Sequence, residues 1–323
     1  MKRLALVAAM TLALGACQGE QAPPPAPAPE PAPAPMVEPV AAPQTAPAVS
    51  GEIPVMDQAF ATKLNTVLAS DTRGTENKAR DGFRHPRETL SFLGIAPGMT
   101  VIEVNPGAGW YTEILAPLLK DSGTLVTAVV DPLKTSSDRA REYSTQANAD
   151  LRTMLGEKID SFGPVQVVEY DPAAPMLGLP GSADMVLTFR STHGWVRAGN
   201  VDAMFRGFFD VLKPGAVLGV EQHRAAAGSD PVVTAPSGYV AEAHVIELAQ
   251  AAGFVLDGSS DVNANPADTR DHPEGVWSLP PNLAGNASDE EKARLTAIGE
   301  SDRMTLRFRK PAEAAAMPAA AVN

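Results

Sequence analysis

The stretch VIEVNPGAGW, residues 101–110, combines residue types that could hold a ligand by the backbone. A β-branched apolar run carries one acid, Glu103, then breaks at Asn105 and Gly107 and restarts after Gly109. Glycine lets a backbone pass close to a ligand, and asparagine tolerates the left-handed conformation. A helix that follows would present N–H groups without intrahelical partners. The stretch predicts either a turn that cradles a ligand or a purely structural turn.

Two phosphate-binding patterns do not fit this turn. A dinucleotide fingerprint needs a third glycine where Thr112 stands, and a P-loop needs Gly-Lys followed by Ser or Thr. What remains is an acid, a gap of two residues and Pro-Gly-x-Gly.

Two histidines are candidate general bases. His193 and Trp195 stand in LTFRSTHGW, where we expect a loop after an apolar run, and His223 follows another apolar run. An imidazole can accept a proton from a hydroxyl or a protonated nitrogen at neutral pH. A histidine after a strand is more often a loop hydrogen-bonder than a base, and Trp195 could be a pocket wall or a core residue. Arg190 could bind an acidic substrate group. The spacing of the histidines and aspartates does not match a metal site, so no metal is expected.

The elements that must position these residues alternate between short apolar runs and helical stretches, which predicts crossovers and a parallel sheet. We expect an α/β, Rossmann-like, doubly wound sheet of seven strands, with helices on both faces. A long irregular insertion, 257–300, precedes the last strand, which we expect to run antiparallel at an edge. The predicted strands are 100–104, 125–130, 165–169, 185–189, 216–221, 254–256 and 304–308.

Ligands of open α/β sheets bind beyond the carboxyl ends of the strands, where the 105–109 turn is expected. Acids follow the second and third predicted strands, at Asp131 and Asp171. They could contact the same ligand or merely cap the segments that follow.

The segment EVNPGAG resembles motif I of the class I S-adenosylmethionine-dependent methyltransferases, with Asn105 at the first glycine position. LKPGAVLGVEQ, residues 212–222, is similar to the strand 5 signature of that family, in which Lys-Pro-Gly ends a helix before an apolar strand. Together with HPRETLSFLGI and LTFRSTHGW, these segments resemble an uncharacterised group of predicted bacterial methyltransferases. The resemblance covers about residues 85–310.

The resemblance implies S-adenosyl-L-methionine as the cofactor and a small molecule as the methyl acceptor. It implies that Asp131 binds the ribose hydroxyls, that Asp171 binds the adenine amino group, and that the base lies near the methyl group, at His193 or His223. Two alternatives stay open: a non-catalytic module that keeps the fold, and an oxidoreductase with an altered nucleotide turn. The turn residues implied in cofactor binding are Glu103, Asn105, Gly107, Ala108 and Gly109.

Composition limits the partners. The formal net charge of -12 argues against a nucleic-acid partner, which would require a basic face. Asn-Pro-Pro-Tyr is absent after the fourth predicted strand, so methylation of DNA adenine or peptide glutamine is not indicated. The sequence does not indicate an oligomeric state.

The first 17 residues have the three parts of an export signal, ending in Leu-Gly-Ala-Cys. This resembles the lipobox of bacterial lipoproteins and implies lipidation at Cys17, the single cysteine of the chain. We expect a lipid anchor, with Gln18 pointing to the periplasmic face of the outer membrane. An ordinary cleaved signal is the alternative.

Four segments are expected along the chain. They are a signal peptide at 1–17, a disordered Pro/Ala-rich linker at 18–56, a methyltransferase-like domain at 57–310 and a disordered tail at 311–323. The linker holds twelve prolines and is expected to be extended polyproline II. Export of a protein that uses a cytosolic cofactor needs an explanation.

Overall fold

The computed structural model describes residues 52–285 and 288–312. The predictions made for 1–17, for most of the linker and for nearly all of the tail, including Cys17, lie outside the described residues. Within the described ranges, the helices are too short or too polar for any of them to cross a membrane.

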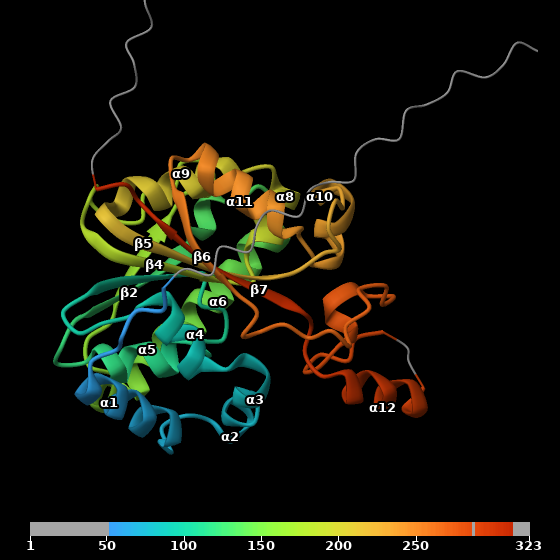
Figure 1. Cartoon of the computed structure of the whole chain (residues 1–323), viewed down its shortest axis with the longest axis horizontal. Helices are drawn as coiled ribbons and strands as arrows, with labels where there is room; N and C mark the ends of the chain where they lie inside the picture. Colours follow the sequence, from blue (N-terminus) through green and yellow to red (C-terminus); the bar gives the residue numbers. More distant parts are fainter. Residues whose placement is uncertain (1–51, 286–287, 313–323) are drawn as a thin grey trace, which may run out of the picture. The chain divides into compact units, whose positions relative to one another are not determined.

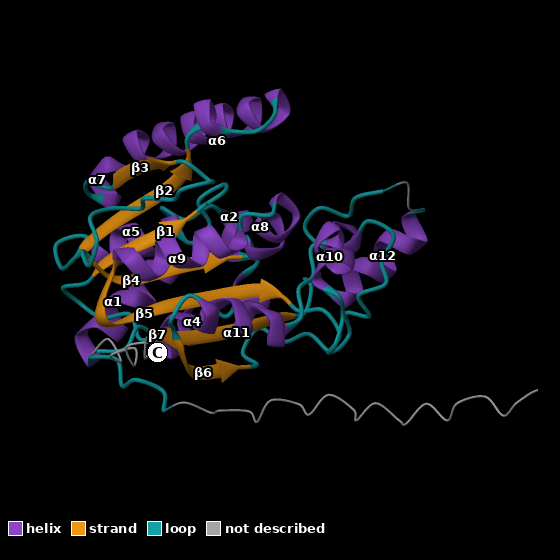
Figure 2. Ribbon diagram, turned by 90° about the horizontal axis from the view of Figure 1, so that it is seen from above, coloured by secondary structure: helices purple, strands orange, loops and turns teal. Residues whose placement is uncertain are grey.

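Seven strands form one mixed sheet in the order β3-β2-β1-β4-β5-β7-β6, and Figure 2 shows them in this succession. All neighbouring pairs are parallel except the two that β7 makes. The Rossmann-like, mostly parallel fold with an antiparallel last strand is thus confirmed. The strands are β1 (Thr100–Val104), β2 (Thr124–Val130), β3 (Gln166–Tyr170), β4 (Ala183–Phe189), β5 (Leu212–His223), β6 (Val255–Ser260) and β7 (Arg303–Arg309).

Helices cover both faces of the sheet, each over its own apolar core (Figure 1). Successive residues of a strand point to opposite faces. On β1, Val101 therefore belongs to one core and Ile102 to the other. The first core is covered by α1 (Gln58–Ala69), α4 (Pro86–Leu93), α5 (Thr112–Leu119), α6 (Asp138–Glu157) and α7 (Ile159–Phe162). The second is covered by α8 (Thr192–Ala198), α9 (Val201–Val211) and α11 (Glu242–Ala251).

The predicted position of the last strand is wrong. β7 lies between β5 and β6 instead of at an edge. Met304, Leu306 and Phe308 of β7 are fully buried, and an edge position would leave a row of backbone N–H and C=O groups unpaired. The insertion before β7 is not wholly irregular, because it contains α12 (Asp289–Ile298).

The segments around β4 and β5 also differ from the prediction. The residues after β4 form α8 rather than a loop. β5 begins at Leu212, directly after α9, and the register with β4 shifts between Ala183 and Met185. The Lys-Pro-Gly expected to separate helix from strand is therefore a bulge inside β5, with Gly215 at φ 80°. Four short helices were not predicted: α7, α2 (Thr75–Lys78), α3 (Asp81–Arg84) and α10 (Pro231–Thr234).

Candidate functional site

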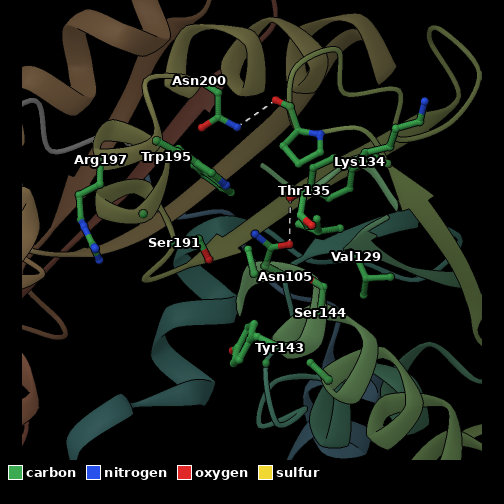
Figure 3. Close-up of a pocket in the computed structure, with 18 of the residues that line it drawn as sticks. Asn105, Val129, Lys134, Thr135, Tyr143, Ser144, Ser191, Trp195, Arg197 and Asn200 are labelled. Atoms are coloured by element: carbon green, nitrogen blue, oxygen red, sulfur yellow. Dashed lines mark hydrogen bonds between the residues drawn. The ribbon is translucent and has the colours of Figure 1, made fainter. Parts of the chain in front are cut away.

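The turn after β1 has the backbone that the sequence predicts. Asn105, Gly107 and Gly109 all have positive φ, at 51°, 59° and 77°. The Tyr170 hydroxyl, at the end of β3, donates to Asn105 Oδ1 at 2.9 Å (Figure 3). Burial raises the pKa of Tyr170, so the hydroxyl keeps its proton and remains a donor. Asparagine in place of glycine is therefore accommodated by its left-handed tolerance and held by one hydrogen bond.

A cavity of about 860 Å³ opens at the carboxyl ends of the parallel strands, beside this turn. We call it the glycine-turn cavity; its walls include Asn105, Gly107, Tyr143 of α6 and Trp195 of α8. In Figure 3, Tyr143 and Trp195 lie on opposite sides of the Asn105 side chain. The volume is within the range of small-molecule sites, and the location is the one where open α/β sheets bind ligands.

Gly107 is the turn residue best suited to a close ligand. A Cβ placed there would meet no atom within 4 Å, so the backbone faces open space. The positive φ disfavours any side chain at this position. A ligand could therefore approach the Gly107 backbone directly.

Three other predicted turn residues do not line the cavity. Glu103 is buried and accepts from Thr112 Oγ1 at 2.6 Å, and burial raises its pKa to about 7. Ala108 is exposed outside the cavity lining. A Cβ on Gly109 would lie 2.6 Å from Met154 Cε, so this glycine makes room for α6. Of the five predicted turn residues, the structure places Asn105 and Gly107 at the cavity.

The two predicted acids have local partners. Asp131 Oδ1 accepts from the Leu133 backbone N–H at 2.8 Å, and Asp171 Oδ1 accepts from Ala173 N–H at 2.8 Å. Neither side chain lines the cavity, although their neighbours Val130 and Pro172 do. Both aspartates therefore cap the segments that follow them, which was one of the two roles considered from the sequence. Their role in binding a ligand stays a prediction.

The sequence analysis did not identify the residues of α6 that line the glycine-turn cavity. Tyr143, Ser144 and Asn148 line the cavity, and Asn148 Nδ2 donates to Val130 O at 3.0 Å. Tyr143 is 71% exposed, so its ring is open to a planar ligand. The polar character of α6 could have indicated this role, because Ser and Asn side chains recur on the helix face that meets the sheet.

His193 and His223 come together, as predicted, with ring centroids 5.9 Å apart. His193 lines the glycine-turn cavity, and its Nδ1 lies 3.4 Å from Gln222 Nε2. Gln222 Nε2 also donates to Gly238 O, which fixes the orientation of the amide. His193 Nδ1 is then the acceptor, and Nε2 carries the proton of the neutral ring.

Burial keeps both imidazoles neutral at pH 7. It lowers the pKa of His193 to about 4, against the opposing hydrogen bond from Gln222. Burial and the neighbouring His193 lower the pKa of His223 well below its usual value. His223 Nδ1 lies 2.6 Å from Ser301 Oγ. Trp195 has both of the roles weighed for it, since it lines the cavity and packs edge-on against Phe208.

Arg190 connects this cavity to a buried ionic cluster. It follows β4 with φ 59°, and its Nη1 lies 3.1 Å from Glu221 Oε1 on β5. Glu221 is fully buried and also accepts from the Tyr111 hydroxyl at 3.0 Å. Burial opposes ionisation of Glu221, but Arg303 and Arg190 hold its pKa below the usual value. In the part of the chain that the structure describes, no three His, Cys, Asp or Glu side chains form a group that could hold a metal ion.

No family model matches the chain, and no curated protein matches it in sequence. Solved structures match it in fold. A SAM-dependent methyltransferase from Aquifex aeolicus is 14% identical, with 77% of this chain and 98% of that chain covered and a TM-score of 0.44. The 4+2 cyclase SpnF is 18% identical, with coverages of 82% and 100% and a TM-score of 0.49. An arsenic(III) S-adenosylmethionine methyltransferase from Chlamydomonas reinhardtii is 14% identical, with coverages of 77% and 73% and a TM-score of 0.44. These are similarities of fold, and no residue role is taken from them.

Proposed function

We propose that this chain binds S-adenosyl-L-methionine in the glycine-turn cavity and transfers its methyl group to a small molecule. The observation that carries the proposal is Gly107, which has left-handed backbone and open space beside it at the carboxyl end of β1. The EVNPGAG resemblance supports the same ligand, as do the solved structures of similar fold that are named for this cofactor.

The residues that fit the cofactor lie on three elements. Asn105 and Gly107 would bind it at the turn, and Tyr143 and Ser144 would contact it from α6. Asp131 uses Oδ1 to cap Leu133 N–H, so Oδ2 would be the atom that accepts from the ribose hydroxyls. When bound, this cofactor supplies an electrophilic methyl group on a sulfonium, so the protein has mainly to align the nucleophile.

The chain's own residues define the acceptor side. Trp195 and Trp277 line the cavity and would exclude water from the reacting atoms of a bound acceptor. His193 Nε2 carries the proton while Gln222 donates to Nδ1, so in this tautomer the ring donates a hydrogen bond to the acceptor. Taking a proton from a hydroxyl acceptor requires the other tautomer, which breaks the contact with Gln222. A sulfur or already deprotonated nucleophile would not need that change.

The decisive test is calorimetry of the full chain with S-adenosylmethionine, S-adenosylhomocysteine and NAD in parallel. We expect both sulfur compounds to bind and NAD to fail. Gly107→Val should abolish binding by filling the open space. Gly181→Val is the matched control, because Gly181 has φ 64° and equally open surroundings but lines neither cavity. Binding of NAD alone would contradict the methyl-transfer proposal.

A second candidate is a non-catalytic module that keeps the fold. It is favoured by the local partners of Asp131 and Asp171 and by the packing of Met154 against Gly109. Failure of all three ligands to bind in the same calorimetry would favour this reading.

We propose further that the protein is exported and anchored by lipid at Cys17, on the periplasmic face of the outer membrane. The support is the Leu-Gly-Ala-Cys segment and the absence of any other cysteine in the chain. The enzyme would then act before export or on cofactor that reaches the envelope. Cys17→Ser should release the protein from the membrane fraction or leave its signal uncleaved; unchanged fractionation and processing would contradict the anchor.

A further inference from the structure

A second cavity, of about 230 Å³, adjoins the glycine-turn cavity. Arg190 and Trp277 line both. The remaining walls come from distant parts of the chain and include Arg80, Arg84 and His223. We call it the arginine cavity, since three of the side chains in its walls are guanidinium groups.

The cluster around this cavity holds more cations than anions. Glu300 pairs with Arg80, Arg84 and Arg303 at 2.6, 3.0 and 3.0 Å. Glu221 pairs with Arg190 at 3.1 Å and with Arg303 at 3.5 Å. Two carboxylates therefore pair with four guanidinium groups, which leaves two positive charges in excess. His223 adds no charge, because it is neutral at pH 7.

Both carboxylates are already ionised, so they cannot supply further negative charge. Although burial opposes it, Arg84 and Arg303 lower the pKa of Glu300 to about 2. The two excess positive charges are shared by four side chains that are 1–23% exposed, and an unpaired charge removed from water is costly.

Arg84 shows where a partner is lacking. Its side chain is 4% exposed, and its Nη1 is buried without a hydrogen-bond partner among the described residues. Burial and the nearby Arg190 lower the pKa of Arg84 to about 9. The guanidinium also lies over the Trp110 ring at 4.7 Å, so Trp110 and Glu300 hold it in place. A rigid, incompletely bonded guanidinium at a cavity wall is arranged for an oxyanion.

We propose that the arginine cavity binds a carboxylate or phosphate group carried by the molecule that accepts the methyl group. The cavity is smaller than sites that hold a whole ligand, which suits one charged group of a larger molecule. The rest of that molecule would extend past Arg190 and Trp277 toward His193. That the bound molecule is the methyl acceptor rests on the proposed function. That the cavity binds an anion rests only on the charges around it.

The test is calorimetry of the full chain with inorganic phosphate and, separately, with acetate, each against chloride at equal ionic strength. We expect phosphate or acetate to bind where chloride does not, and the tighter of the two assigns the group. Arg80→Gln and Arg84→Gln should each weaken that binding by ~10-fold or more, as for hydrogen bonds to a charged group. Arg84→Lys should restore part of the affinity.

Arg73→Gln is the matched control. Arg73 is as buried as Arg84, lies over the same Trp110 ring and pairs with Asp81, but it does not line the cavity. The Arg73→Gln variant should bind the anion with the same affinity as the unmodified chain. If Arg84→Gln fails to fold, Arg80→Gln carries the test, because the Arg80 side chain is 23% exposed and tolerates replacement better.

S-adenosylhomocysteine affinity, measured on the same samples, separates the two proposals. Anion binding without cofactor binding contradicts methyl transfer and supports the oxyanion site. Cofactor binding with neither anion bound more tightly than chloride overturns the oxyanion site alone. Anion binding that is unchanged in both arginine variants also overturns it, since the anion then lies elsewhere.

Discussion

The two adjoining cavities depend on different parts of the chain. At the glycine turn, three left-handed backbone positions lie within five consecutive residues, from Asn105 to Gly109. At the arginine cavity, the pair between Arg80 and Glu300 joins residues 220 positions apart. The first depends on the conformations that each residue permits, and the second on charges that the fold removes from water. The two should therefore respond differently to mutation and to pH.

The largest expected effect is on turnover, and it concerns the two histidines that lie where the cavities adjoin. If His193 is the base, His193→Ala should lower turnover by ~10²–10⁴-fold with cofactor affinity nearly unchanged. The measurement is initial rates with an acceptor found by screening phenols, amines and envelope extracts. His223→Ala is the paired variant. Loss only in that variant would move the base to β5, and full turnover in both would mean that no histidine is needed.

The arginine cavity should depend on Glu221 for its stability. Glu221→Ala leaves Arg190 and Arg303 without this buried carboxylate, and the free energy of unfolding should fall by ~3–5 kcal/mol in urea titrations. Glu169→Ala is the control, because Glu169 pairs with Arg152 at the surface, where such pairs contribute at most ~1 kcal/mol. Equal losses in both variants would mean that the buried cluster has no special energetic role.

The two regions should respond to pH in opposite senses. Glu103 has a folded pKa of about 7 against 4.5 unfolded, so the folded state retains a proton and stability falls as pH rises from 4.5 to 7. Glu300 has a folded pKa of about 2 against 4.5, so its contribution is full above 4.5 and lost as pH falls toward 2. Each contribution is roughly 3 kcal/mol.

Urea unfolding at a series of pH values checks both slopes. Glu103→Gln should reduce the fall in the free energy of unfolding between pH 4.5 and 7, and should leave the fall below pH 4.5 unchanged. Glu300→Gln should reduce the fall below pH 4.5 and leave the fall between pH 4.5 and 7 unchanged. Parallel changes in the two variants would contradict the contrast between the regions.

The smallest expected effect concerns Asp131. If it binds the cofactor ribose, Asp131→Ala should weaken cofactor binding by roughly 1.5–3 kcal/mol. If it only caps, the free energy of unfolding should fall by about 1 kcal/mol with affinity unchanged. Asp230→Ala is the matched control, since Asp230 precedes a proline and accepts from Val232 N–H at 2.8 Å in the same way, and it lines neither cavity. A change in affinity equal to that of the control would contradict a ligand role.

Elements with a periodic apolar pattern were predictable to within a few residues. β1 has the bounds that the sequence predicts, and the bounds of β2 and β3 differ from the prediction by one residue. Segments without a strong pattern were not predictable. α8 was taken for a loop because its seven residues include a glycine and few apolar positions. α12 was missed because only Leu295 on it is buried.

The site divides in the same way. Asn105, Gly107 and His193, which line the glycine-turn cavity, were predicted from residue type and from their place after a strand, because those properties are local. Tyr170 and Gln222 were not singled out, because their hydrogen bonds reach residues 65 and 29 positions away. Arg84 was not singled out, since an arginine in a charged segment looks solvated until the fold buries it.

The sequence by itself determined the alternating elements, the left-handed turn after β1 and the proximity of the two histidines. Each follows from steric limits or from the rule that parallel strands end at the same edge of a sheet. Only the tertiary structure decided that β7 pairs between β5 and β6, that Met154 occupies the space beside Gly109, and that four arginines share two carboxylates. Those outcomes depend on contacts between residues far apart in the chain, and such contacts have an energy only once the fold has brought them together and removed the water between them.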